Sequence, residues 1–296
     1  MSQTASPSSG KRYGLVQVCK VWEVPRSTVY LHRSAPVTEP NRRGPKGFHS
    51  DEELLGHIRQ VLEESPFTSE GYRKVWAQLR FRGIRTSRER TLRIMRENGL
   101  SAFQRQGRPH GPKAHDGTIK TTKVDKMWGT DMTTTLTVKE GNAAVFFAID
   151  HCSLECVGIH AAKRGTRFEA LEPIRQGMRH AFGVFGQDIA HGLKLRHDHG
   201  SQYVSDVFQD EIAFLGIESS PSYVREPQGN GIAERFVRVL KENLLWVRHF
   251  DTVEDLRRAL LEFKETYNRK WIIGRHGYKT PSQVRERQVP LTEKAA

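Results

Sequence analysis

The spacing of apolar residues near the N-terminus predicts two short helices joined by a turn. Residues 15–24 have helical apolar spacing, Pro25 interrupts it, and residues 26–33 begin with Ser and Thr side chains that suit a helix start. The second helix would present Arg26 and Thr28 in its first turn, the position from which a helix-turn-helix reaches a DNA groove. A helical hairpin that makes no DNA contact is the alternative.

A second helical unit follows a segment at residues 34–49 that is rich in Pro, Gly and Arg and reads as a linker. Apolar spacing predicts three helices in this unit, at residues 54–62, 72–79 and 87–98. Ser87 would cap the third helix and Gly99 would end it. Arginines crowd the last two helices and favour a surface that follows phosphates, although such a run is also compatible with a solvated face. The candidates for DNA contact here are Arg85, Arg88 and Arg90.

From residue 127 onward, strand patterns replace the purely helical ones. Three β-branched or apolar runs, joined by short turns, precede an alternation of helices and strands. We expect strands at 128–138, 143–150 and 156–162, a helix at 167–182, a strand ending at 198, a helix at 204–215, a strand at 217–223, and two further helices, the second at 252–271. This order predicts an α/β domain.

Three carboxylates occupy distinctive places in this domain. Asp131 lies within the first β-branched run, Asp198 ends a short strand before a glycine turn, and Glu234 lies on an amphipathic helix after a Pro/Gly-rich loop. Thirty-five residues separate Asp198 from Glu234. On the helix, Arg238 and Lys241 fall on the same face as Glu234. For Glu234 and Arg238 alone, an ordinary stabilising pair is the alternative.

This order of acids resembles the DDE motif of retroviral integrases and insertion-sequence transposases. The surrounding residues resemble the catalytic subunit of insertion-sequence family three, the second-frame product. The blocks that carry the resemblance are Trp128-Gly129-Thr130-Asp131, His197-Asp198-His199-Gly200-Ser201-Gln202-Tyr203, Asn230-Gly231-Ile232-Ala233-Glu234-Arg235-Phe236, Tyr267-Asn268 and Tyr278-Lys279-Thr280-Pro281, with Gly71-Tyr72-Arg73-Lys74-Val75-Trp76 and Arg93-Ile94-Met95-Arg96-Glu97-Asn98-Gly99-Leu100 before them. The chain departs from the family where Gly229-Asn230 stands in place of an Asp-Asn pair.

The resemblance implies a ribonuclease H-like catalytic domain, a mixed five-stranded sheet with helices, preceded by small all-α helix-turn-helix-like modules. In that fold the first strand is central and the fourth lies beside it. Asp131 and Asp198 would then be neighbours, and the helix after the last strand would bring Glu234 opposite them.

The same resemblance implies the chemistry. Three clustered acids repel one another unless cations neutralise them, and hard oxygen ligands suit two Mg²⁺ ions, for which Mn²⁺ can substitute. The implied reaction is nicking at element ends followed by transfer of the 3′-hydroxyl into target DNA. Lys241 resembles the basic residue that contacts end DNA in the family, and the other candidates near the acids are Arg238, Asn230 and His197.

The charge distribution supports double-stranded DNA as the partner. The net charge is +13, and residues 1–126 hold 24 Lys and Arg against 12 Asp and Glu, whereas the remainder holds 23 against 22. A concentrated basic excess attracts polyanions through counterion release, and an anionic membrane or simple solubility are the alternatives. The family further implies a homo-oligomer in a synaptic complex and a DNA-binding partner encoded in an upstream frame.

These observations predict five segments and one location. The segments are an N-terminal helix-turn-helix-like segment with linker (1–48), a basic helical DNA-binding module (49–103), a basic tether (104–126), an integrase-type catalytic core (127–285) and a C-terminal tail (286–296). With no membrane span or signal peptide in the pattern, we expect a cytoplasmic protein. Two alternatives stay open: a nuclease of this fold that cuts without joining, and a DNA-binding regulator with a dead catalytic domain.

Overall fold

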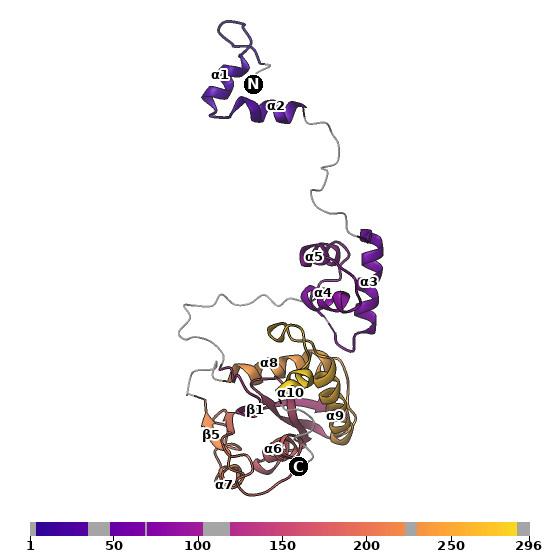
Figure 1. Ribbon diagram of the computed structural model, residues 1–296, viewed down its shortest axis with the longest axis vertical. Coiled ribbons are helices and arrows are strands. Elements are labelled where there is room, and N and C mark those ends of the chain that lie inside the picture. Colours follow the sequence, from indigo (N-terminus) through magenta and orange to yellow (C-terminus); the bar gives the residue numbers. More distant parts are fainter. Residues whose placement is uncertain (1–3, 35–47, 69, 103–118, 223–229, 289–296) are drawn as a thin grey trace. The chain divides into compact units, whose positions relative to one another are not determined.

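The structure is a computed structural model that describes residues 4–34, 48–68, 70–102, 119–222 and 230–288 (Figure 1). Several sequence predictions concern residues outside these ranges. They are most of the linker at 34–49, most of the tether at 104–126, the last residue of the strand predicted at 217–223, and most of the tail at 286–296.

The first unit, residues 1–48, contains the two predicted helices. They are α1 (Leu15–Val21) and α2 (Arg26–Ser34). Cys19 is buried between them, and Arg26 and Thr28 are exposed in the first turn of α2. The expected helix, turn and helix are therefore present in this unit.

The second unit, residues 49–296, begins with a three-helix module. Its helices are α3 (Asp51–Glu64), α4 (Tyr72–Phe81) and α5 (Arg88–Glu97). Ser87 caps α5 by accepting a hydrogen bond from the Arg90 backbone N–H, and Gly99 takes a positive φ of 66° just beyond the helix end, as the sequence predicts. Leucine, isoleucine and valine side chains from the three helices form a separate small core.

The rest of this unit is built on a five-stranded mixed sheet with strand order β3-β2-β1-β4-β5. The strands are β1 (Met127–Thr137), β2 (Gly141–Asp150), β3 (Cys156–Ala162), β4 (Lys194–His197) and β5 (Glu218–Pro221). The first three form an antiparallel meander, whereas β4 and β5 run parallel to β1. The fold expected from the sequence is confirmed, with β1 at the centre of the sheet and β4 beside it.

Helices cover both faces of this sheet (Figure 1). One face packs on α6 (Arg167–Phe182) and α7 (Asp206–Phe214), whose apolar side chains meet Trp128, Phe146 and Leu195 of the strands. The other packs on α8 (Gly231–Leu240) and α9 (Val253–Lys270), against Phe147 and Ile149. Successive side chains of β2 therefore serve opposite cores, as alternation along a strand requires.

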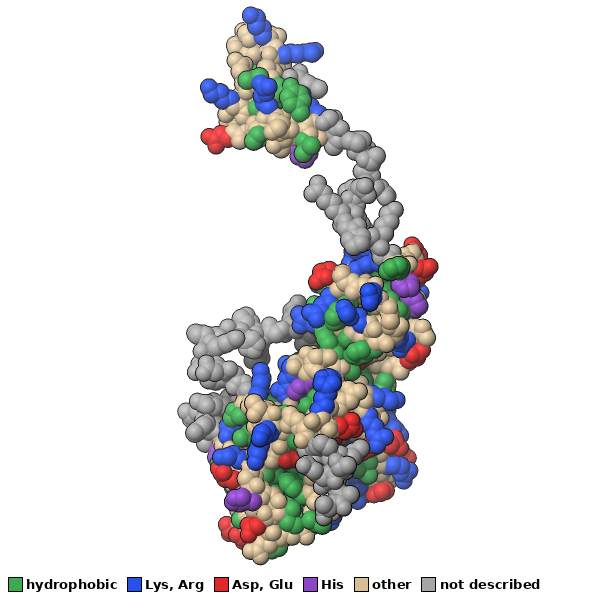
Figure 2. Space-filling model, in the orientation of Figure 1, with side chains coloured by type: hydrophobic (Ala, Val, Ile, Leu, Met, Phe, Trp, Pro, Cys, Tyr) green, Lys and Arg blue, Asp and Glu red, His purple; other side chains and the backbone are tan. Residues whose placement is uncertain are grey.

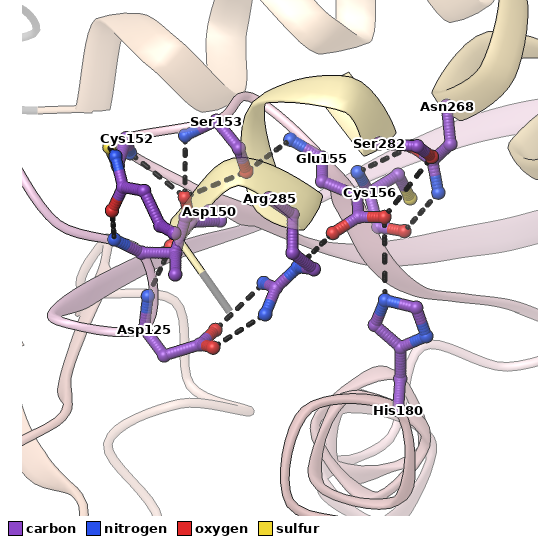
Figure 3. A network of polar contacts seen from close by, with 12 residues as sticks. Asp125, Asp150, Cys152, Ser153, Glu155, Cys156, His180, Asn268, Ser282 and Arg285 are labelled. Atoms are coloured by element: carbon purple, nitrogen blue, oxygen red, sulfur yellow. Dashed lines mark hydrogen bonds and ion pairs between the residues drawn. The ribbon is translucent and has the colours of Figure 1, made fainter. Parts of the chain in front are cut away.

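Some elements of the structure were not expected from the sequence, and two of them bear on the site and the core. A π-helical turn, η2 (Lys241–Leu245), continues α8, and a short helix, α10 (Pro281–Gln288), follows the last predicted one. Helix α10 contributes Arg285, which is 3% exposed and forms ion pairs with both Asp125 and Glu155 (Figure 3). His180 of α6 also approaches Glu155, at 3.4 Å. Although burial alone would raise the pKa of Glu155, hydrogen bonding with His180 and the charge of Arg285 hold it below its usual value.

Asp150, at the end of β2, has a structural role in the same region (Figure 3). One of its carboxylate oxygens accepts hydrogen bonds from the backbone N–H groups of Cys152 and Ser153 and from the Ser153 hydroxyl. The other oxygen accepts from the Asp125 backbone N–H. The carboxylate thus caps the turn after β2.

Candidate functional site: a carboxylate group on one face of the sheet

The first acid, Asp131, lies in the middle of the sheet. It belongs to β1 and pairs with Phe147 of β2, so its side chain emerges on the face that α8 and α9 cover. The β-branched residues around it favour this extended conformation. Its Oδ1 atom accepts a hydrogen bond of 2.8 Å from the Met132 backbone N–H.

The second acid, Asp198, directly follows β4 on the adjacent strand. Gly129 of β1 pairs with Arg196 of β4 in parallel register, so the residue two places beyond Arg196 comes level with Asp131 and on the same face. Asp198 Oδ1 accepts the Gly200 backbone N–H at 2.9 Å. A Cβ at Gly200 would lie 2.9 Å from that oxygen and 2.5 Å from Gln202 Nε2, so a larger residue here would have to displace the Gln202 side chain and press on the Asp198 carboxylate.

The third acid, Glu234, comes from α8. Ile232, Phe236 and Leu240 of this helix are buried against the sheet, whereas Glu234 is exposed beside them. Asn230 precedes the helix as its N-cap residue. A helix that lies over β1 thus carries Glu234 to the face on which Asp131 and Asp198 stand.

The pKa of Asp131 reports the proximity of these groups. Burial above all, with the negative charges of Asp198 and Glu234, raises it to about 6, against the opposing effects of the Met132 N–H and the positive charge of Lys241. Burial also raises the pKa of Glu234. We call Asp131, Asp198, Glu234 and Lys241 the carboxylate site.

The donor set of the carboxylate site fits Mg²⁺ or Mn²⁺. All three acids offer hard carboxylate oxygens, and Asp131 is a partly desolvated carboxyl that a cation would favour in its ionised form. Within the described residues, the His, Cys, Asp and Glu side chains as they stand form no group of three or more that is close enough to hold an ion. The fit of the carboxylate site to Mg²⁺ or Mn²⁺ therefore rests on the chemistry of the three acids and on the charge coupling between them.

The comparisons with known proteins agree with this architecture. The HTH-like domain family matches residues 49–108, and the Integrase core domain family matches residues 121–227 and, through a second description of that domain, residues 215–281. Transposase InsD for insertion element IS2A/D/F/H/I/K of Escherichia coli is 27% identical over 264 residues, which cover 87% of this chain and 86% of that protein. The chain belongs to the insertion-sequence transposases with an integrase core.

A second relative is longer than Transposase InsD. The Insertion element IS2A uncharacterized 48.2 kDa protein of Escherichia coli is 26% identical over 285 residues, which cover 94% of this chain. The chain spans 66% of that protein's length.

Two solved structures are similar to the transposase at low sequence identity. The simian T-cell lymphotropic virus intasome in complex with PP2A regulatory subunit B56 gamma matches with a TM-score of 0.49 and 19% identity, over 82% of this chain and 76% of that chain. The HTLV-2 integrase catalytic core domain in complex with magnesium matches with a TM-score of 0.41 and 18% identity, over 57% of this chain and 99% of that chain.

Two residues expected near DNA have buried side chains in the transposase. His197 is fully buried, and its ring packs near Tyr203 and Phe208 in the core that α6 and α7 cover. Its side chain therefore lies on the opposite face of the sheet from Asp131. Asn230 is 6% exposed, and its amide donates to the Thr130 backbone oxygen at 3.2 Å.

The basic candidates differ in how they are engaged. Arg238 Nε donates to Glu242 at 2.9 Å, rather than to Glu234. Arg90 is held by Asp51 and by the His49 backbone oxygen. Acids that are distant in sequence therefore neutralise part of the arginine run, which the sequence could not reveal.

The remaining basic candidates are exposed. Arg85 is exposed in the turn before α5, and Arg88 lies over the Trp76 ring, 4.3 Å from its centroid. Lys and Arg side chains are visible over the α3–α5 module in Figure 2. No helix among the described residues is long and apolar enough to cross a membrane.

Sequence reasoning missed His151, which lies behind the carboxylate site. It directly follows β2 and is fully buried, and its Nε2 atom lies close to Gly129, two residues before Asp131. Burial lowers its pKa to about 4, so the ring is neutral. The only signal in the sequence is its position beside Asp150 at a strand end.

Proposed function

We propose that this transposase nicks DNA at the ends of its element and transfers the resulting 3′-hydroxyl into target DNA, as a DDE-type polynucleotidyl transferase. The observation that carries the proposal is the electrostatic coupling of Asp131 with Asp198, Glu234 and Lys241. Three acids from two adjacent strands and one helix, beside one cation, suit a phosphodiester held at a divalent cation site.

In this proposal each of the three acids supplies carboxylate oxygens to the divalent cations. Asp131 and Asp198 offer theirs from the sheet, and Glu234 offers its own from α8. Two Mg²⁺ ions, when bound, would activate the attacking oxygen and stabilise the leaving oxygen of an in-line displacement, and Mn²⁺ can substitute. No side chain of the chain needs to become a covalent nucleophile.

Lys241 has a separate role. Its ammonium group is close enough to lower the pKa of Asp131, so it can also pair with a phosphate oxygen held at the acids. It would thereby orient the scissile phosphate. Arg238 would add a weaker contact, because Glu242 already neutralises it.

The helical modules would hold the rest of the DNA. Segments 1–48 and 49–103 each carry a net positive charge, and the tether 104–126 joins them to a core that runs from residue 127 to the end of α10 at Gln288. Arg26 and Thr28 would approach a groove from α2, and Arg85 and Arg88 would contact phosphates. Arg90 would support this surface through Asp51.

Joining requires two element ends and a target, so we propose that the transposase acts on double-stranded DNA as a homo-oligomer in a synaptic complex. A DNA-binding protein from an upstream frame is a further proposed partner. We place the reaction in the cytoplasm, where the chromosome of a bacterial cell lies.

The test is an assay that separates nicking from joining. Purified transposase is incubated with end-labelled duplexes taken from the DNA that flanks its coding region, with a target plasmid and Mg²⁺, and products are resolved on denaturing gels. The proposal predicts a nicked strand with a free 3′-hydroxyl and a labelled product joined to the plasmid. Nicking without joining would indicate the nuclease alternative, and DNA binding without either product would indicate the regulator.

A further inference from the structure

Asn230 stands at the start of α8 but does not cap that helix. Its side chain makes no capping hydrogen bond, although Asn is a favoured N-cap residue. Instead, Nδ2 donates to the backbone oxygen of Thr130 at 3.2 Å, and the side chain is buried. The amide therefore joins the first residue of the helix to the central strand.

The two ends of this hydrogen bond are next to two acids. Thr130 directly precedes Asp131 in β1, and Asn230 precedes Glu234 by four residues, about one helical turn. The Asn230 amide is thus a short connection between the strand that carries Asp131 and the helix that carries Glu234.

Gly129 and His151 shape the space around the amide. A Cβ at Gly129 would lie 2.9 Å from His151 Nε2, closer than ordinary contact, and 3.4 Å from Asn230 Oδ1, so a larger residue here would have to displace the His151 ring. His151 is fully buried, and its Nδ1 donates to the Ile119 backbone oxygen at 3.1 Å, which leaves Nε2 as an acceptor.

Both atoms that face Gly129 are acceptors without a protein partner among the described residues. They are His151 Nε2 and Asn230 Oδ1. A buried amide is kept where a specific orientation is required, since an apolar residue would fill the space without leaving an acceptor unpaired. The bond to Thr130 is the one described contact that fixes this orientation.

We propose that Asn230 is a positioning residue that sets the separation of Asp131 and Glu234 through its bond to Thr130, in the pocket formed by Gly129 and His151. This inference rests on the proposed cation-dependent chemistry. Without the bond, α8 would still pack through Ile232, Phe236 and Leu240, but its first turn would be free to shift relative to β1. Two carboxylates that move apart hold a shared cation less tightly.

The test compares Asn230→Ser with the wild-type protein. Serine starts a helix as well as asparagine does, but it is too short to reach Thr130, so this change removes the connection and keeps the helix start. Asn230→Gln is a second variant, which keeps the amide on a longer side chain. Asn243→Ser in η2 is the matched control, because the Asn243 amide donates to the Val239 backbone oxygen of α8 and accepts from the Thr68 backbone N–H in the loop between α3 and α4, so it makes no bond to β1.

Two readouts are taken for each protein. One is the Mg²⁺ concentration that gives half of the maximal nicking rate at saturating DNA, and the other is the rise in Tm that Mg²⁺ or Mn²⁺ causes without DNA. We expect Asn230→Ser to raise the half-saturating Mg²⁺ concentration by roughly 10–100-fold, the range found when residues that orient metal ligands are lost. The cation-induced rise in Tm should shrink in parallel, with a smaller effect in Asn230→Gln and none in Asn243→Ser.

The outcomes separate this inference from the proposed function. If the wild-type protein neither nicks DNA nor gains Tm with the cation, the proposed function fails. If the wild-type protein does both, and Asn230→Ser lowers the basal Tm without changing either cation response, Asn230 is a structural residue and the inference is overturned. If Asn230→Ser does not fold, the same two cation responses are compared between Asn230→Gln and the wild-type protein, and they decide the inference in the same way.

Discussion

Asp131 and Asp198 stand level on adjacent parallel strands, because Gly129 pairs with Arg196 and each acid lies two residues further along. This register, rather than any loop, sets their spacing. A slip by one residue would turn one of the acids to the opposite face of the sheet. The pair is thus as rigid as the centre of the fold, whereas Glu234 depends on how α8 is held.

The first prediction concerns stability in the absence of divalent cations. The folded protein holds the pKa of Asp131 at about 6, above its ordinary value of 3.8, because burial and then the neighbouring acids disfavour the charge. The unfolded chain releases this proton at lower pH, so the folded state loses stability as pH rises from about 4 to about 6. Asp131→Asn removes that loss.

In EDTA, Asp131→Asn should therefore unfold at a higher temperature than the wild-type protein at pH 7.5, and the difference should narrow at pH 4. Added Mg²⁺ should raise the Tm of the wild-type protein and leave that of the variant unchanged. Thermal unfolding followed by circular dichroism gives the Tm of both proteins under each condition. If the Tm difference between variant and wild type were the same at both pH values, the pKa of Asp131 would not be raised in the folded protein.

The second prediction separates Lys241 from the general basic surface. Lys241→Ala should slow end nicking at saturating DNA, because it removes a cation beside the acids and misplaces the attacked phosphate. Lys120→Ala changes an exposed lysine in the tether, so it should lower overall affinity only slightly and leave the saturated rate unchanged. Equal slowing by the two changes would return Lys241 to the role of a solvated helix residue.

The third prediction concerns DNA affinity in the α3–α5 module. Replacing both Arg85 and Arg88 by Ala should weaken binding and reduce the slope of log affinity against log salt concentration by about two, since each phosphate contact contributes about 0.9. Filter binding over a salt series measures this slope. Arg90→Ala is the control, because Asp51 already neutralises Arg90. The loss of Arg90 should lower the Tm of the protein and leave the slope of log affinity against log salt nearly unchanged. A larger change of slope for Arg90 would reverse these assignments.

The fourth prediction tests the buried ion pairs of α10. Arg285→Met leaves the buried acids Asp125 and Glu155 without their shared cation, which should cost about 3–5 kcal/mol in the free energy of unfolding. Urea unfolding at pH 7 measures the loss. Arg287→Met, on the same helix but exposed, should stay within about 0.5 kcal/mol of the wild-type protein. Similar losses for both would mean that α10 contributes only through its helix packing.

The sequence predicted the order of the strands and helices because the patterns are strong there. A β-branched run identified the strand around Asp131, and the glycine turn marked the strand end at Asp198. Helix periodicity placed Glu234 and Lys241 on one face, although η2 begins at Lys241 and widens the helix there. The charge coupling of Lys241 to Asp131 agrees with that face.

Other features depend on contacts between distant segments, and no local pattern signals them. The α10 helix carries a buried arginine where an apolar residue would have marked a core helix, so it was assigned in part to a tail. Arg90 pairs with Asp51, 39 residues away, which a view of the local charge run could not show. The burial of Asn230 against Thr130 likewise joins residues 100 positions apart.

The most direct test of the account is single-turnover joining of a pre-nicked element end to a target plasmid in Mg²⁺, with Asp131→Asn, Asp198→Asn and Glu234→Gln beside the wild-type protein. Each change removes one ligand charge and leaves the basic surface intact, so each should lower the joining rate by more than about 100-fold, the upper end of the loss found when a residue that only orients a metal ligand is removed. DNA affinity should change by less than about a factor of two, because no basic phosphate contact is removed. Joining at a near-wild-type rate by any one of the three variants would contradict the assignment of that acid, and with it the three-carboxylate site.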